Sequence, residues 1–190
     1  MVISKIFKWG FNYFRLFFLK LRYGNRINII IKQGEHPPFV SWKSKIGISG
    51  KGMLILYPGV YISPFCQVQT LDEGKIILKS NSYIGDFSRV VSKKYVEIGT
   101  NTLLANNVSV YDHDHKYSSP HLSITEAGYL CGKVIIRDNC WLATNVVVLR
   151  DTTVSSHSVV GANSVAKGNL SETGIYAGAP AVLKKKYKYV

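Results

Sequence analysis

Aliphatic residues recur every six positions along the second half of the chain. Counting in sixes from residue 136 meets only aliphatic side chains: Ile136, Leu142, Val148, Val154, Val160 and Ala166. Four residues after each of the first five comes a small or β-branched side chain: Cys140, Val146, Thr152, Ser158 and Ser164. The same register appears earlier, with weaker copies nearer the N-terminus: Ile98, Leu104 and Val110, then Ile46, Val60, Ile76 and Ile84. An ordinary half-buried strand would alternate with a period of two instead.

A period of six predicts a parallel β-helix. Each unit is a short strand followed by a bend, so three units close a triangular coil with the aliphatic side chain pointing inward and a small residue at the corner. Stacked coils bury a continuous column of these side chains, whereas one coil alone buries almost nothing. We therefore expect an all-β fold of this kind over residues 33–183.

The first segment has a helical period. Its apolar residues fall in steps of three and four: Ile3, Ile6, Phe7, Phe11, Phe14, Phe17, Phe18 and Leu21. Polar and basic side chains take much of the other side: Lys5, Lys8, Asn12, Arg15 and Arg22. The pair Gly24-Asn25 is a plausible stop within an N-terminal unit of residues 1–32. A basic helix with an aromatic face is typical of one that lies in a membrane interface; packing on the protein's own core or on a neighbouring subunit is the alternative.

Positive charge is concentrated at the two ends of the chain. The formal net charge is +13, and residues 1–32 hold seven Lys or Arg and no acid. A second basic run lies in a C-terminal tail, residues 184–190, while the middle is nearly neutral. Such ends attract an anionic membrane surface. A nearly neutral middle without a known nucleic-acid-binding fold argues against nucleic acid as a partner.

Cysteine usage points to a reducing compartment. The three residues Cys66, Cys131 and Cys140 show no metal-ligand spacing, and an odd number argues against a disulfide framework. No signal peptide is evident, and the longest apolar run of the first segment falls far short of the roughly 20 residues that span a bilayer. We expect a cytoplasmic protein, peripheral on the inner face of the membrane.

The six-residue register breaks after Val110 and resumes near Val134, which predicts an extruded loop at about 111–133. Loops on a rigid scaffold often carry function. This one begins with Asp112-His113-Asp114-His115. Acylation of a hydroxyl needs a base, and an imidazole oriented by a neighbouring carboxylate suits that task. Either histidine could serve on this reasoning.

Three motifs resemble the hexapeptide-repeat acetyltransferases, most closely the maltose/galactoside and polysaccharide O-acetyltransferase branch: Ile136-Arg-Asp-Asn-Cys-Trp-Leu-Ala-Thr-Asn-Val-Val-Val, Val160-Gly-Ala-Asn-Ser-Val and Tyr176-Ala-Gly-Ala-Pro-Ala. The resemblance covers roughly residues 46–185. It implies a left-handed coil, a homotrimer, acetyl-CoA as cosubstrate and no metal. The implied reaction is direct attack on acetyl-CoA by a hydroxyl of a sugar or glycan intermediate, such as a lipid-linked one.

The resemblance also suggests site residues. Matching Val108-Ser-Val to the family strand that ends at the catalytic histidine places the base at His115, with His113 two residues earlier as the alternative. Contacts to acetyl-CoA are implied for Trp141, Ala143, Thr144, Ala162, Lys167, Pro180, Lys184 and Lys185. The small residues among them are equally explained as corners of the repeat. The stretch 85–89 lacks the asparagine with which sugar-acetylating relatives bind the acceptor, so the acceptor stays open.

Two other functions fit parts of the sequence. A γ-type carbonic anhydrase uses this scaffold, and His113, His115 and His121 could be imagined as its metal ligands, although the Ala-Gly-Ala-Pro ending is typical of the CoA enzymes. A non-catalytic, membrane-attached scaffold would explain the basic ends. We expect His36 and His157 to be solvent-facing.

Overall fold

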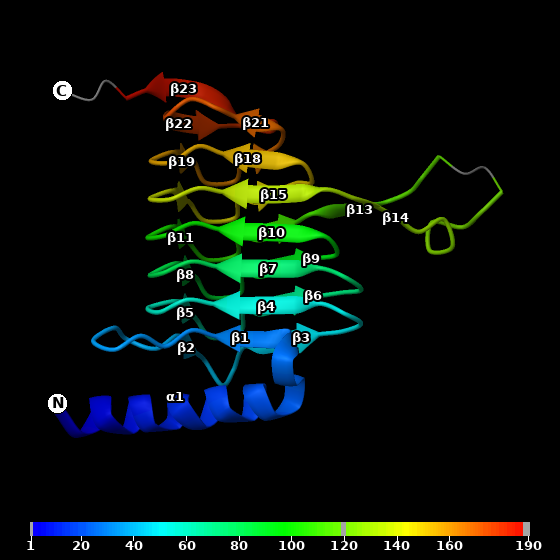
Figure 1. Cartoon of the computed structure of the whole chain (residues 1–190). Coiled ribbons are helices and arrows are strands. Elements are labelled where there is room, and N and C mark those ends of the chain that lie inside the picture. The colour runs from blue at the N-terminus through cyan, green and yellow to red at the C-terminus, as the bar shows by residue number, and fades with distance from the viewer. Residues whose placement is uncertain (1, 119–120, 188–190) are drawn as a thin grey trace.

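The computed structural model describes residues 2–118 and 121–187, without the side chains of residues 2–9. One helix is followed by a tall stack of short strands (Figure 1). The helix α1 spans Val2–Tyr23, and a short 3₁₀ helix, η1, spans Gly24–Arg26. The expected division of the helix into an apolar and a polar side also involved Ile3, Lys5, Ile6, Phe7 and Lys8, whose side chains lie outside the described part.

Except for β13 and β14, the strands form three sheets, which are the three faces of a prism, and all strands in them are parallel apart from β23. The first contains β1 (Ile27–Ile29), β4 (Met53–Leu56), β7 (Lys75–Leu78), β10 (Tyr95–Ile98), β15 (Lys133–Ile136), β18 (Thr152–Val154) and β21 (Asn169–Leu170). The second contains β2 (Phe39–Val40), β5 (Tyr61–Ile62), β8 (Tyr83–Ile84), β11 (Leu103–Leu104), β16 (Trp141–Leu142), β19 (Val159–Val160), β22 (Gly174–Ala177) and β23 (Val182–Lys186). The third contains β3 (Lys45–Ile48), β6 (Gln67–Thr70), β9 (Arg89–Ser92), β12 (Ser109–Tyr111), β17 (Val147–Val148) and β20 (Val165–Ala166).

The coil is left-handed, as the resemblance implied. In Figure 1 the strands nearest the viewer run to the left while the chain rises. The six-residue register is confirmed, because all six positions from Ile136 to Ala166 are fully buried inside the prism. The small residues four positions later are buried too, among them Ser158 and Ser164. A continuous column of buried aliphatic side chains, with small residues at the corners, thus holds the stack of coils together.

Left-handed backbone conformations turn the corners. Asn101 and Asn139 occupy one corner with φ of 55° and 57°, and Asn145 and Asn163 occupy the next with φ of 63° and 58°. Asparagine tolerates this region better than most residues. Their amides also hydrogen-bond from one coil to the next, at 3.4 Å in the first pair and 3.0 Å in the second. Repeated asparagines therefore shape the bends and connect them.

Helix α1 covers the open end of the prism, below β1 and β2 (Figure 1). Asn12, Leu16, Leu19 and Tyr23 are buried against the first coil. The Asn12 side chain donates to the carbonyl of Pro38 at 2.8 Å and accepts the N–H of Val40 at 3.0 Å, which gives the edge of β2 polar partners. Packing on the protein's own core, one of the two alternatives, thus accounts for one face of the helix.

The opposite face of α1 is exposed and aromatic. Phe11, Phe14, Phe17, Phe18 and Leu21 are between 49% and 70% accessible. At 100° per residue they occupy the arc opposite the buried residues, and Lys20 and Arg22 stand at its two edges. Among the described residues, no helix is long and apolar enough to cross a membrane.

Both expected boundaries of the β-helix shift. Helix α1 ends at Tyr23, next to the expected stop Gly24-Asn25, but the prism begins at Ile27, which pairs with Leu54, and not at residue 33. At the other end, β23 folds back antiparallel on β22. The lysines at 184–186 therefore form an edge strand that closes the last coil rather than a free tail; residues 188–190 lie outside the described part.

Candidate active site at the root of a projecting hairpin

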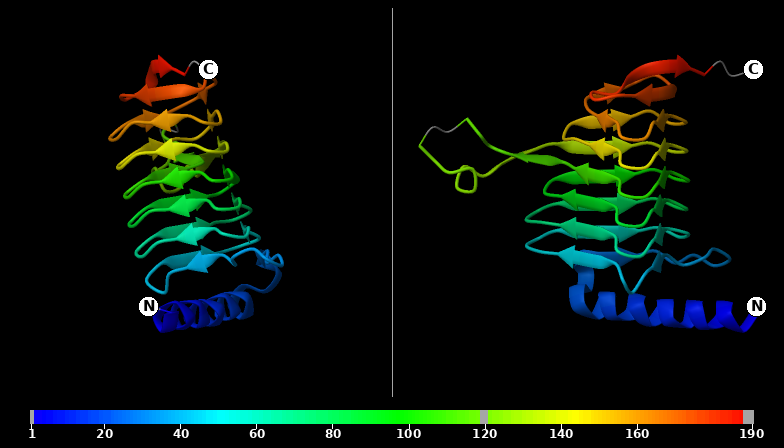
Figure 2. Two further views of the ribbon diagram at one scale, coloured as in Figure 1. Left: turned by 90° about the vertical axis from the view of Figure 1, so that its left-hand side faces the viewer. Right: turned by 180° about the vertical axis from the view of Figure 1, so that it is seen from behind.

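A two-stranded ribbon replaces one corner of the prism. Strands β13 (His113–His115) and β14 (Tyr129–Cys131) pair antiparallel and project from the body between β12 and β15 (Figures 1 and 2). The expected loop is therefore confirmed as an extrusion, but its two ends form strands. Side chains alternate along a strand, so both histidines lie on one face of the ribbon and Asp114 lies on the other.

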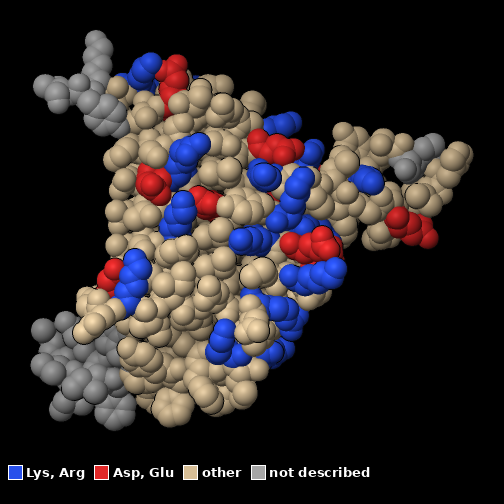
Figure 3. Space-filling view, viewed as in Figure 1, with Lys and Arg blue, Asp and Glu red and all other residues tan. Residues whose placement is uncertain are grey.

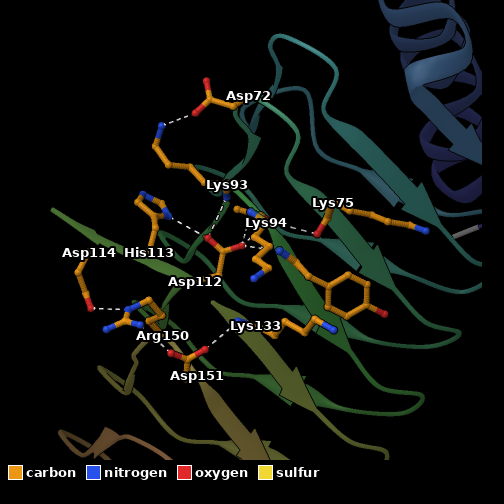
Figure 4. A network of polar contacts seen from close by, with 12 residues as sticks. Asp72, Lys75, Lys93, Lys94, Asp112, His113, Asp114, Lys133, Arg150 and Asp151 are labelled. Atoms are coloured by element: carbon orange, nitrogen blue, oxygen red, sulfur yellow. Dashed lines mark hydrogen bonds and ion pairs between the residues drawn. The ribbon is translucent and has the colours of Figure 1, made fainter. Parts of the chain in front are cut away.

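Asp112 anchors the root of this ribbon. Its side chain is fully buried, and its Oδ2 atom accepts the hydroxyl of Ser92 at 2.6 Å. The same oxygen accepts the backbone N–H groups of Lys94 at 2.8 Å and Tyr95 at 2.7 Å. The Oδ1 atom accepts the N–H of Lys93 at 2.8 Å. The end of β9 and the bend after it thus form a cradle of donors around one carboxylate (Figure 4).

The buried carboxylate also holds His113. The Nδ1 atom of His113 lies 2.9 Å from Oδ1 of Asp112. Burial alone would raise the pKa of Asp112, but hydrogen bonds from His113, Ser92 and the backbone outweigh it and lower the pKa below its ordinary value of 3.8. A charged carboxylate can only accept, so Nδ1 of His113 donates and a neutral ring keeps its lone pair on Nε2. This arrangement orients an imidazole for proton abstraction.

His115 has a different environment. It is exposed, and its ring centre lies 4.4 Å from that of Tyr129. No carboxylate of the described residues contacts it. Tyr129 also meets the ring of His113 edge-on at 5.5 Å, and the Lys93 ammonium lies 3.8 Å from the centre of the Tyr129 ring. The two histidines, one tyrosine and one lysine therefore form a single cluster, and of its two histidines only His113 is oriented by an acid.

The other face of the ribbon is fixed to the next coil. Arg150 donates from Nε to Asp114 at 2.8 Å and from a terminal nitrogen to Asp151 at 2.7 Å. On the histidine face, Lys93 pairs with Asp72 of a coil nearer the N-terminus, at 2.7 Å. Basic side chains gather on this side of the body, interspersed with acids (Figure 3). The histidine face is therefore directed toward the helix end of the prism, and the Asp114 face toward its C-terminal end.

The residues implied for acetyl-CoA do not meet the histidines within one chain. Trp141 is half exposed on β16, in the sheet on the side away from the ribbon (Figures 1 and 2). Ala143 is buried in the bend that follows, and Thr144 is exposed there. Lys167 alone of the set stands at the ribbon's own corner, between β20 and β21. The remainder are exposed near the C-terminal coils: Ala162, Pro180, Lys184 and Lys185.

The metal alternative has no support in the described part of the chain. No three His, Cys, Asp or Glu side chains there converge as possible ligands. His113 and His115 instead contact Asp112 and Tyr129, as described above.

Several residues of the cluster were not foreseen from the sequence. Ser92 and Lys93 come from a bend where the inward residues Val90 and Ile98 are eight positions apart instead of six, and this enlarged step was an available signal. Tyr129 and Arg150 carried no such signal, because nothing in the repeat indicates which side chains the ribbon will touch.

Comparisons with known proteins agree with this architecture. WbbJ of Escherichia coli K12, provisionally described as a lipopolysaccharide biosynthesis O-acetyl transferase, is 33% identical over 130 residues, which are 65% of this chain and about two thirds (66%) of that protein. WcaF of the same organism, provisionally described as a colanic acid biosynthesis acetyltransferase, is 24% identical over 85% of this chain and 88% of its own. No family model matches the chain.

Among solved structures, a mutant of AntD, an N-acyltransferase from Bacillus cereus in complex with dTDP and coenzyme A, superposes with a TM-score of 0.67 at 21% identity, over 80% of this chain and 81% of its own. At that identity the likeness shows only that the two proteins share a fold, which is a left-handed β-helix. Fold and sequence relatives together define a hexapeptide-repeat acyltransferase. The chain belongs to this family, and its sequence relatives include WbbJ and galactoside O-acetyltransferases, whose names specify transfer to oxygen.

Proposed function

We propose that this protein transfers the acetyl group of acetyl-CoA to a hydroxyl of a sugar in a glycan under construction. The relatives WbbJ and WcaF, both described as acetyltransferases of polysaccharide biosynthesis, support the reaction and the acceptor class. One observation of the structure carries the chemistry: a histidine at the root of a projecting ribbon, oriented by a buried carboxylate.

In this mechanism Nε2 of His113 takes the proton of the acceptor hydroxyl while its oxygen attacks the thioester carbonyl. The carbon–sulfur bond then breaks, CoA leaves as a thiolate and receives the proton, and the sugar keeps the acetyl ester. Asp112 holds the tautomer and stabilises the imidazolium that forms. The resemblance favours His115, and the geometry favours His113 because only its ring is held by an acid. No covalent enzyme intermediate is needed.

Acetyl-CoA would lie between subunits of a homotrimer. Trp141, Ala143 and Thr144 stand on a different face of the prism from the histidines, so one chain alone does not unite them. A neighbouring copy can bring its Trp141 face against the ribbon of the first. Lys184 and Lys185, exposed on β23, would meet the nucleotide phosphates.

The aromatic face of α1 supports contact with an anionic membrane. Lys20 and Arg22 flank the face, so basic groups stand next to the rings where lipid phosphates would lie when the rings enter the interface. Residues 1–32 carry no acidic side chain that such a surface would repel. A second copy of this basic helix would be repelled by the same charge.

Thiol release from acetyl-CoA, measured against a panel of sugar, glycan and amine acceptors, tests the reaction. A hydroxyl-bearing glycan should give the highest turnover, with a product that has gained one acetyl ester. Exclusive acetylation of an amine would contradict an O-acetyltransferase, and no thiol release with any acceptor would contradict acyl transfer altogether.

A further inference from the structure

The end-cap helix fixes a direction for the whole molecule. It lies across the end of the prism, along the plane of a coil rather than along the direction in which the coils stack (Figures 1 and 2). Leu16 and Leu19 pack upward on the first coil, so Phe14, Phe17 and Leu21 point away from the prism. The aromatic face is therefore parallel to every coil above it.

We infer that the prism stands upright on the membrane and acetylates a sugar held well above the bilayer, in the distal part of a lipid-anchored glycan. This inference rests on the proposed acetyl transfer and membrane contact, and it adds an orientation and a substrate geometry. A surface that is parallel to the coils can meet a flat bilayer along the whole helix only if the coil stack rises away from the lipid.

The strand order gives the height of the site. The ribbon leaves the body between β10 and β15, and β10 is the third strand above β1 in its sheet. Neighbouring strands are about 4.8 Å apart, which puts β10 roughly 14 Å above β1. With the helix axis about 10 Å below the first coil, the root of the ribbon lies roughly 25 Å above the helix.

The ribbon also presents its histidines downward. Lys93 links the histidine face to Asp72 in a coil nearer the helix, whereas Asp114 on the other face pairs with Arg150 in a coil farther from it. A glycan that rises from a lipid anchor would thus meet His113 before it met the C-terminal coils. Sugars next to the lipid would remain at headgroup level and would not reach the base.

Native thiols allow the height to be measured without an activity assay. Cys131 on the ribbon is exposed, whereas Cys66 and Cys140 are only 1% and 2% accessible. A fluorophore on Cys131 would transfer energy to a headgroup dye in vesicles of phosphatidylcholine and phosphatidylglycerol. Two further labels, in a Cys131→Ser background, complete the set: Leu103→Cys on the far side of the same coil, and Val182→Cys on the last strand. Both parent positions are exposed.

An upright prism predicts equal transfer from positions 131 and 103, corresponding to roughly 25 Å, and much weaker transfer from position 182, whose strand β23 is the fourth above β11 in the same sheet. Clearly unequal transfer from 131 and 103, or the strongest transfer from 182, would overturn the upright orientation. If a Phe14→Ser/Phe17→Ser double variant still binds vesicles, the aromatic face of α1 is not the membrane-binding surface. Absence of vesicle binding by the unaltered chain would contradict membrane docking altogether. Turnover with a soluble acceptor, measured in parallel, reports separately on the proposed acetyl transfer.

A paired acceptor test addresses the substrate geometry. On vesicles, a long lipid-linked glycan should be acetylated at least about tenfold faster than a short one with the same terminal sugar, because a tether that cannot span the distance gives almost no effective concentration. In detergent solution, where the bilayer constraint is gone, the two rates should converge. Equal rates on vesicles would contradict the inference.

Discussion

Asp112→Asn tests the cradle at the root of the ribbon. The two side chains have nearly the same shape, but an amide has one acceptor oxygen where the carboxylate has two. Oδ2 accepts three donors and Oδ1 accepts the Lys93 N–H and His113. Either orientation of the amide therefore points its N–H groups at other donors, and buried groups lose their partners.

The cost follows from the number of donors affected. A buried donor left without a partner costs about 1–3 kcal/mol, so two or more give a loss of about 2–4 kcal/mol in the free energy of unfolding after partial relaxation. In a chain of this size that lowers the melting temperature by roughly 5–15 °C. Because His113 loses its orientation as well, kcat should fall by about 10² or more.

Denaturant unfolding and thiol release measure the two effects, and Asp114→Asn is the matched control. Asp114 is two residues away, is 46% accessible and contacts Arg150 on the opposite face of the ribbon. Its replacement should cost less than about 1 kcal/mol and leave turnover nearly unchanged. Unaltered stability and turnover in Asp112→Asn, or equal losses in both variants, would refute the cradle as the device that orients the base.

Further outcomes follow from the same structure. Leu142→Ala, in the fully buried column, should destabilise the fold by about 2–5 kcal/mol, while Leu103→Ala on the outer face of the adjacent strand should cost less than about 1 kcal/mol in the same denaturation assay. The lowered pKa of Asp112 stabilises the fold fully above 3.8 and less as the pH falls below that value, so the acid limb of stability against pH should flatten in Asp112→Asn. Replacing Lys184 and Lys185 together by alanine should raise KM for acetyl-CoA about tenfold with kcat retained; an unchanged KM would exclude them from phosphate binding.

The repeat could be predicted from sequence because its period reports directly on burial. Each aliphatic residue of the six-residue series from Ile136 to Ala166 faces the same interior, so the sequence pattern follows directly from the packing. The helix was harder, because both of its faces are apolar. Leu16 and Leu19 pack on the prism, whereas the described phenylalanines of the more regular apolar stripe are exposed: Phe11, Phe14, Phe17 and Phe18. Periodicity finds an amphipathic helix but does not say which face is covered.

The site was predictable only as far as its position in the chain. A break in the register marked the ribbon, and the Asp112–His115 cluster marked its root. The choice between the two histidines depends on the bend after β9, whose backbone amides surround Asp112 and fix the carboxylate beside His113. That bend lies twenty residues earlier in the chain, and no local pattern links it to the histidines.

Turnover of the two histidine variants tests the central claim most directly. His113→Asn and His115→Asn each keep approximate shape but cannot take a proton at neutral pH. With a glycan acceptor, His113→Asn should lower kcat by at least about 10² while KM for acetyl-CoA barely changes, because the imidazole meets the hydroxyl and not the nucleotide. His115→Asn should cost much less. Near-full turnover in His113→Asn with loss in His115→Asn would contradict the assignment of the base, and full turnover in both would contradict histidine base catalysis at this ribbon.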